Sequence, residues 1–144
     1  MVDTHAHIYA EEFDEDIDAV IERARVSGVT SIILPNVDAD SLPRMLRLTE
    51  SYPGFCYPAI GIHPTSVLSD YQKQLDLVSN EIKKGIYLAV GEIGIDLYWD
   101  KSLLSEQIVA FQYQLQLAVD YQLPVIIHVR DSFRETITAM EPFR

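Results

Sequence analysis

Five short apolar runs, separated by stretches with a helical pattern, constrain the fold of this chain more than any other feature of its sequence. The runs are continuous rather than alternating, which is typical of parallel strands buried on both faces. They occupy residues 1–5, 30–35, 55–62, 86–94 and 124–129. Amphipathic segments follow them at 14–28, 38–54, 69–85, 102–122 and 131–144. This alternation predicts a series of right-handed βαβ units.

The spacing of the runs favours a barrel over an open sheet. Each unit takes roughly 30 residues, and eight such units would need about 250 residues, a usual length for a (β/α)8 barrel. A doubly wound open sheet has the same rhythm, but the glycine-rich phosphate loop expected after its first strand is missing. We therefore predict an α/β fold of the (β/α)8 TIM-barrel type, with about five of eight units present, as a single domain over residues 1–144.

All four histidines of the chain fall at the predicted C-terminal ends of strands. They are His5, His7, His63 and His128. Barrel enzymes carry their active sites at this end of the sheet, and structural histidines would have no reason to follow the same rule. If His5 and His7 lie on a strand, their side chains point to one face together with Asp3, because residues two apart share a face.

Two carboxylates accompany the histidines in the segment GEIGID. Glu92 lies among apolar residues, where a carboxylate needs a cation or hydrogen-bond donors, and Asp96 is expected in the loop that follows. Histidine and carboxylate ligands together suit Zn, Mn, Fe or Ni, and carboxylate-rich sites also accept Mg. A glutamate can bridge two ions through its two oxygens, as in phosphoryl hydrolases. The only cysteine is Cys56, so a structural zinc site built on thiolates is not expected.

Other residues near these motifs have two interpretations each. Arg130 can bind a phosphate with its guanidinium, or form a plain ion pair with Asp131. His63 can be a substrate ligand or proton carrier, or a histidine with no role. Tyr98 and Trp99 can stack on a base, but we favour packing within their loop.

Composition limits the classes of partner. The chain has 144 residues, 48% of them hydrophobic, and a net charge of −11. This charge argues against a surface that coats nucleic acid non-specifically, although bound cations would still let the site accept an anionic substrate. No apolar run is long enough to span a bilayer and no secretory signal is present. A single cysteine favours a reducing, cytoplasmic location.

The motifs DTHAH, GIHP, GEIGID and PVIIHVRD, in this order and spacing, resemble those of the TatD family of metal-dependent hydrolases. The resemblance covers essentially the whole chain. It implies a (β/α)8 barrel with two divalent metal ions, Mg, Mn or Zn. It also implies 3′–5′ exodeoxyribonuclease or related phosphodiesterase activity on DNA or RNA, through attack by a metal-activated water.

The resemblance also assigns roles by position. His5 and His7 match metal ligands of the first strand, Glu92 matches the bridging carboxylate, and His128 matches a ligand of the second metal. Of these, Glu92 and His128 are the expected catalytic residues because they hold the catalytic ions. Three further residues match motif positions that we interpret as substrate-binding: His63, Asp96 and Arg130.

Two further ligands of the family, a histidine after the sixth strand and an aspartate after the seventh, have no match up to Arg144. We therefore expect this chain to be the N-terminal portion of a longer protein, or the missing part of the barrel to come from elsewhere. Two other functions stay open. An amidohydrolase-like enzyme that cleaves C–N bonds also begins with H-x-H, but many such enzymes have a modified lysine where this chain has Glu92. A partial barrel that binds metal without catalysis is the third possibility. The sequence indicates neither a protein partner nor a membrane association.

Overall fold

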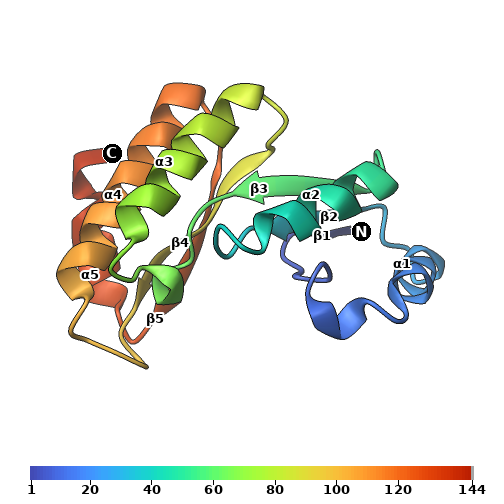
Figure 1. Cartoon of the computed structure of the whole chain (residues 1–144), viewed down its shortest axis with the longest axis horizontal. Helices are drawn as coiled ribbons and strands as arrows, with labels where there is room; N and C mark the ends of the chain where they lie inside the picture. The colour runs from blue at the N-terminus through green and yellow to red at the C-terminus, as the bar shows by residue number, and fades with distance from the viewer. Residues whose placement is uncertain (144) are drawn as a thin grey trace.

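The five predicted strands form one parallel sheet in chain order, β1-β2-β3-β4-β5. The computed structural model describes residues 1–143, and Figure 1 shows β1 near the N-terminus, with β4 and β5 toward the other end of the sheet. The strands are β1 (Val2–Asp3), β2 (Ser31–Pro35), β3 (Cys56–Ile60), β4 (Ala89–Asp96) and β5 (Val125–Arg130). The sheet is curled into part of a barrel, which confirms the predicted fold class.

The helices lie within the predicted segments. They are α1 (Ile17–Val26), α2 (Leu42–Ser51), α3 (Tyr71–Glu81), α4 (Leu104–Tyr121) and α5 (Phe133–Met140). Short 3-10 turns occur at η1 (Glu11–Phe13), η2 (Pro64–Ser66), η3 (Ile82–Lys84) and η4 (Glu141–Phe143). Pro43 lies in the first turn of α2, where its missing N–H costs no hydrogen bond. Figure 1 shows α3, α4 and α5 side by side at one end of the sheet, with α1 and α2 at the other.

The main core lies between the helices and the central strands. Every residue of β4 is buried, and α4 packs against this strand. Ile93, Ile95 and Phe111 belong to this core and are fully shielded from solvent. Burial of each such side chain contributes about 1.5–3 kcal/mol. The most deeply buried strand, β4, is thus the one that carries the acidic residues of the predicted site. Within residues 1–143, no helix has both the length and the apolar character needed to cross a membrane.

Two predicted strand boundaries were wrong. β1 ends at Asp3, so His5 and His7 follow the strand rather than lie on it. Here the Asp3 carboxylate accepts the His5 backbone N–H in place of a strand partner, although the Ala6 N–H still donates to the Ile33 carbonyl of β2. β4 begins later than predicted and extends through Asp96, which we had expected in the following loop.

Candidate metal centre

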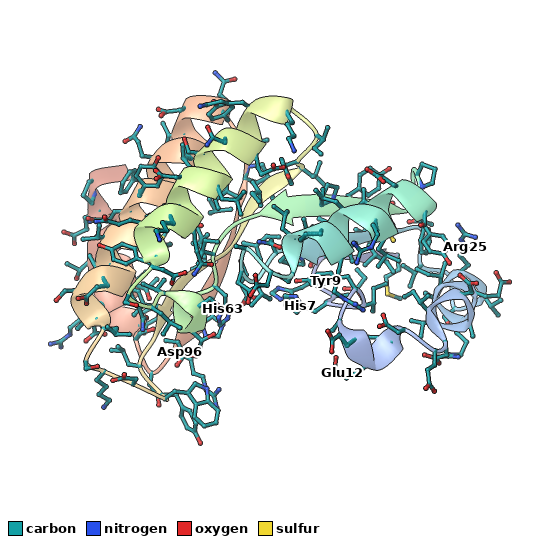
Figure 2. All side chains as sticks on the ribbon, viewed as in Figure 1. His7, Tyr9, Glu12, Arg25, His63 and Asp96 are labelled. Atoms are coloured by element: carbon teal, nitrogen blue, oxygen red, sulfur yellow. The ribbon has the colours of Figure 1, made fainter. Side chains whose placement is uncertain are left out.

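Glu92 stands at the middle of the predicted site, and its two oxygens face two different pairs of histidines. Oε2 lies 3.0 Å from His5 Nε2 and 3.3 Å from His7 Nε2. Oε1 lies 3.1 Å from His128 Nδ1 and 3.8 Å from His63 Nε2. The structure thus brings all four histidines together around one carboxylate. Figure 2 shows His7 and His63 on the same edge of the sheet.

The donor atoms form two groups that each fit a metal ion. One group is His5, His7 and Glu92, and the other is His63, Glu92 and His128. In the first group, the Nε2 atoms of His5 and His7 lie only 3.0 Å apart. Imidazole nitrogens and carboxylate oxygens this close can share one ion at bond lengths of about 2.0–2.2 Å. The residues present would therefore fit one ion at His5, His7 and Glu92 and a second at Glu92 and His128, with His63 beside the second position.

Tyr9 orients His7 toward this group. The Tyr9 hydroxyl donates its proton to the Pro35 carbonyl over 2.5 Å and lies 2.8 Å from His7 Nδ1. Because that proton is used, the Tyr9 oxygen accepts from His7 Nδ1–H, and the lone pair of His7 must be on Nε2. Nε2 is the nitrogen that faces Glu92 and His5. Such outer partners of a histidine ligand set both its tautomer and its ring orientation.

Replacing Tyr9 with phenylalanine is expected to weaken metal binding at the His5–His7 group by about 10–100-fold, the usual cost of losing an outer-shell hydrogen bond. Isothermal titration calorimetry with Mn²⁺ or Zn²⁺ measures the change. Tyr87→Phe is the matched control, because Tyr87 is also a buried tyrosine that donates to a side chain, Glu81, away from the histidines. Equal affinities for Tyr9→Phe and Tyr87→Phe would contradict the assignment.

Asp96 orients His128 in the corresponding way. Its Oδ2 lies 2.9 Å from His128 Nε2, and its Oδ1 accepts the Tyr98 backbone N–H over 2.9 Å. A carboxylate at Nε2 places a proton there, so Nδ1 of the neutral ring is the nitrogen left to bind an ion beside Glu92. Asp96 is almost fully buried. These contacts favour a positioning role for Asp96 over the direct substrate contact suggested by its motif.

His63 lies beside His128 with its other nitrogen held by the chain. The Thr65 backbone N–H donates to His63 Nδ1 over 3.2 Å, so the proton of the neutral ring is on Nε2. This N–H lies 3.1 Å from His128 Nδ1. Burial, with the charge of His128 as the next cause, lowers the pKa of His63 to about 4. His63 is therefore neutral near pH 7 and presents an N–H donor to the site.

We expect His63 to titrate with a midpoint near pH 4 in the metal-free chain. The pKa of His63 in the folded chain lies below its value in the unfolded chain. Between about pH 6.5 and pH 4 the unfolded chain therefore binds more protons. His63 thus lowers the free energy of unfolding as the pH falls through this range. NMR of the histidine ring protons in EDTA measures the midpoint, with His63→Gln used to assign the signal. A midpoint near 6.5 would show that the site is open to solvent.

The histidines determine the charge state of Glu92. Burial alone would raise the pKa of Glu92, but hydrogen bonds with His128 and His7 and the charges of His63 and His5 outweigh it and hold this pKa far below its usual range. The hydrogen bond to Glu92 correspondingly raises the pKa of His128, against the effect of burial. An ion that binds Nδ1 of His128 would therefore compete with a proton for this nitrogen.

Buried amides of α4 fix the backbone next to the site residues. Gln107 accepts the Asp96 N–H over 2.8 Å and donates to the Asp96 carbonyl over 3.1 Å. Two turns further along α4, Gln114 accepts the N–H of Ile62, the neighbour of His63, over 2.7 Å. Both glutamines are nearly inaccessible to solvent. Hydrogen bonds from α4 therefore fix the backbone at Asp96 and next to His63.

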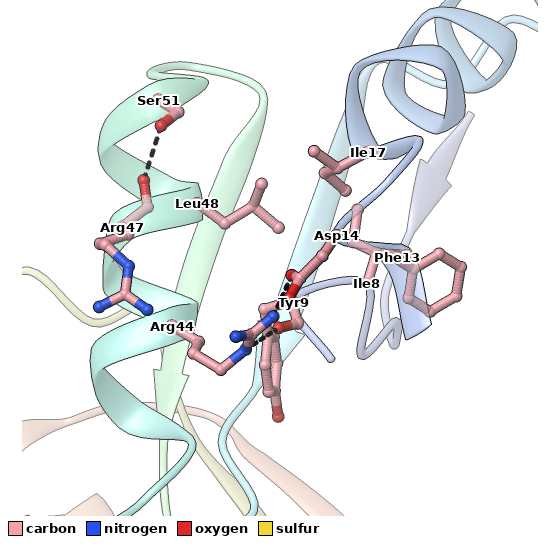
Figure 3. Close-up of a pocket in the computed structure, with 9 residues that line it drawn as sticks. All are labelled: Ile8, Tyr9, Phe13, Asp14, Ile17, Arg44, Arg47, Leu48 and Ser51. Atoms are coloured by element: carbon pink, nitrogen blue, oxygen red, sulfur yellow. Dashed lines mark hydrogen bonds and ion pairs between the residues drawn. The ribbon is translucent and has the colours of Figure 1, made fainter. Parts of the chain in front are cut away.

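An arginine supports the segment that carries His5 and His7. Arg44 reaches from α2 and donates to the Tyr9 backbone carbonyl over 2.8 Å, and it also pairs with Asp14 (Figure 3). These contacts lie beside a pocket between α2 and the η1 segment. Since β1 ends early, this brace and the Tyr9 hydrogen bonds hold the irregular histidine segment in place.

Arg130, Tyr98 and Trp99 lie together at the rim of the site. Within residues 1–143, no ion pair involves Arg130, so the expected alternative of a pair with Asp131 was wrong. The Arg130 guanidinium lies instead over the Tyr98 ring, 3.7 Å from its centroid. The Tyr98 and Trp99 rings pack edge to face within their loop, as we favoured, and they are 53% and 72% exposed.

Sequence reasoning missed Tyr9, Gln107 and Gln114. Tyr9 continues the two-residue spacing of His5 and His7, which was a usable signal for a third group on the same side. The two glutamines interrupt the apolar stripe of α4 at positions seven residues apart, and a polar residue on a buried stripe indicates a hydrogen-bond partner. Which partner each one takes depends on the packing of α4 on β4.

Comparison with known proteins agrees with this geometry. The family model described as TatD related DNase matches residues 2–144. The uncharacterized metal-dependent hydrolase YabD of Bacillus subtilis is 36% identical over 98% of this chain and 55% of its own length. The 3′-5′ ssDNA/RNA exonuclease TatD of Yersinia pseudotuberculosis is 31% identical over 99% of this chain and 55% of its own length.

A solved structure shows the same fold. The crystal structure of YjjV, a TatD homologue from Escherichia coli, superposes with a TM-score of 0.85 at 35% identity over 99% of this chain and 55% of that one. This chain thus spans about half the length of the relatives it matches. The matched motifs, the partial barrel and the histidine–glutamate cluster agree, and the chain belongs to the TatD family of metal-dependent hydrolases.

Proposed function

We propose that this protein hydrolyses phosphodiester bonds as a 3′–5′ exodeoxyribonuclease, using two divalent ions, Mg, Mn or Zn. One observation carries the proposal: the two oxygens of Glu92 face two separate groups of histidine nitrogens. A pair of ions that share a carboxylate suits in-line displacement at phosphorus, because it stabilises both the attacking and the leaving oxygen. The name of the Yersinia relative supports nucleic acid as the substrate.

Each residue of the site has a role in this proposal. His5, His7 and Glu92 hold one ion, and Glu92 and His128 hold the other. Asp96 and Tyr9 keep the ligating nitrogens of His128 and His7 aimed at those positions. His63 presents its Nε2–H to a phosphate oxygen, and Arg130 supplies an unpaired positive charge at the rim.

The buried Cys56, the only cysteine of the chain, is compatible with the reducing cytoplasm that we propose as the location.

A single-strand degradation assay tests this function. The 144-residue chain is incubated with 5′-labelled single-stranded DNA and Mn²⁺ or Mg²⁺, with His128→Ala as a parallel sample. We expect progressive shortening from the 3′ end that disappears in EDTA and in the variant. A product that shortens from the 5′ end would contradict the proposed polarity.

Assays on the same purified chain distinguish two other functions. Hydrolysis of a cyclic amide without phosphodiester cleavage would identify an amidohydrolase-like enzyme. Stoichiometric metal binding without either reaction would identify a metal-binding partial barrel. The second outcome has specific support, because the chain spans only about half the length of its relatives.

A further inference from the structure

We propose that Trp99, Tyr98 and Arg130 form a nucleotide-binding ledge next to the metal centre, where a base of a single-stranded nucleic acid stacks on Trp99 and a phosphate binds Arg130. The inference rests on the proposed function, since it names the part of the chain that holds the substrate strand. It goes beyond that function by assigning a stacking residue that does not hold metal.

The three side chains of the ledge contact one another. The Tyr98 and Trp99 rings pack edge to face, with centroids 4.8 Å apart and planes at 88°. Arg130 lies over Tyr98, with its Cζ 5.4 Å from the Trp99 centroid as well. The Tyr98 face is therefore occupied, whereas Trp99 is 72% exposed. Exposing a large apolar ring carries a hydration cost that a stacked base would remove.

The ledge is joined directly to the metal centre. The Tyr98 backbone N–H donates to the Asp96 carboxylate, which also holds His128. Arg130 follows His128 by two residues on β5 and pairs in register with Asp96 on β4. A group bound at Arg130 is thus held next to the strand positions that carry the site. Within residues 1–143 Arg130 forms no ion pair, although its charge lowers the pKa of Asp96, so its guanidinium can bind an external anion.

A pocket beside Trp99 provides space for the ligand. It has a volume of about 330 Å3 and lies between the η2 turn and the loop after β4. Pro64, Val67, Leu68, Trp99 and Leu103 supply its apolar walls, and Asp96 and Asp100 add two carboxylates. The apolar walls suit a base, and Arg130, with its Cζ 5.4 Å from the Trp99 centroid, supplies a cation for a phosphate at the side of the ring.

Trp99 is the only tryptophan in the chain, so its fluorescence reports on the ledge directly. The full chain in EDTA is titrated with a ten-residue oligothymidylate, its RNA counterpart, and an abasic DNA of the same length and charge. We expect saturable quenching by both base-containing strands and much weaker quenching by the abasic strand. Quenching that is equal for the abasic strand would overturn base stacking.

Variants separate the two contacts. Labelled-oligonucleotide anisotropy is expected to show about tenfold weaker binding for Trp99→Ala, the scale of one lost stacking contact. Arg130→Gln should reduce the slope of log affinity against log salt by about 0.7, the value for one phosphate contact on a single strand. Tyr121→Ala, an exposed tyrosine at the far end of α4, is the control and should bind like the parent chain.

The outcomes distinguish this inference from the proposed function. Metal-dependent degradation of DNA with no quenching and unchanged binding by Trp99→Ala would overturn the ledge and leave the nuclease in place. Quenching by base-containing strands without metal-dependent degradation would support the ledge and contradict the nuclease. Quenching by a partner protein but by no oligonucleotide would also overturn the ledge.

Discussion

Replacing Glu92 with glutamine is expected to abolish metal-dependent hydrolysis and to weaken the binding of both ions by more than about 100-fold, beyond the usual loss for an outer-shell residue. Glutamine keeps the shape of the side chain but loses the charge and one of the two carboxylate oxygens. Because Oε1 and Oε2 face different histidine pairs, one substitution affects two positions. Calorimetric titration with Mn²⁺ measures both affinities, and the DNA degradation assay measures the rate.

The control for this prediction is Glu50→Gln, which removes a carboxylate from the exposed face of α2. It should bind both ions and degrade DNA at the parental rate. The thermal unfolding of both variants without metal shows whether the fold is preserved. If a folded Glu92→Gln chain still bound two ions at parental affinity, Glu92 could not be the shared ligand.

Replacing Gly94 with alanine is expected to cost about 3 kcal/mol or more of stability, or to prevent folding. Gly94 lies in β4 at φ 147°, a backbone conformation that side chains rarely allow. A Cβ at this position would lie well inside contact distance of the His128 backbone carbonyl on the neighbouring strand. Both the strain and the overlap therefore oppose the substitution. Urea unfolding monitored by circular dichroism measures the loss.

Gly28→Ala is the matched control for backbone strain. Gly28 also has a positive φ, 86°, but a Cβ there would meet no atom within 4 Å. Its expected cost is only about 1–2 kcal/mol, from the left-handed conformation alone. The difference between the stability losses of the two variants measures the cost of the close approach of β4 to β5. Equal losses would mean that the two strands are further apart next to His128 than the structure places them.

The fold was predictable because its signals are local and repeated. Each strand is a continuous apolar run, and each helix has an amphipathic period with a proline or glycine near an end. The gathering of the four histidines also followed from the barrel rule, since the carboxyl ends of parallel strands meet at one edge. The role of Glu92 as the shared acid was inferred from its apolar neighbours and its family motif. In the structure its two oxygens face different histidines, and its role as a metal ligand stays a prediction.

The parts that could not be predicted depend on contacts distant in the sequence. Nothing near Tyr9 in the chain indicates that its hydroxyl reaches the Pro35 carbonyl, 26 residues away. Where β1 ends, the His5 N–H donates to the Asp3 side chain rather than to the neighbouring strand. Arg130, which comes from another strand, lies over Tyr98 rather than over Trp99, and this choice depends on the packing of β5 beside β4. Periodicity alone carries none of this information.

The most direct test of the account is to locate the ions themselves. Crystals of the chain soaked with Mn²⁺ and measured at a wavelength where manganese scatters anomalously would show each bound ion as a peak. We expect two peaks, one between Glu92, His5 and His7 and the other between Glu92 and His128. A single peak, or two peaks that do not share Glu92, would contradict it.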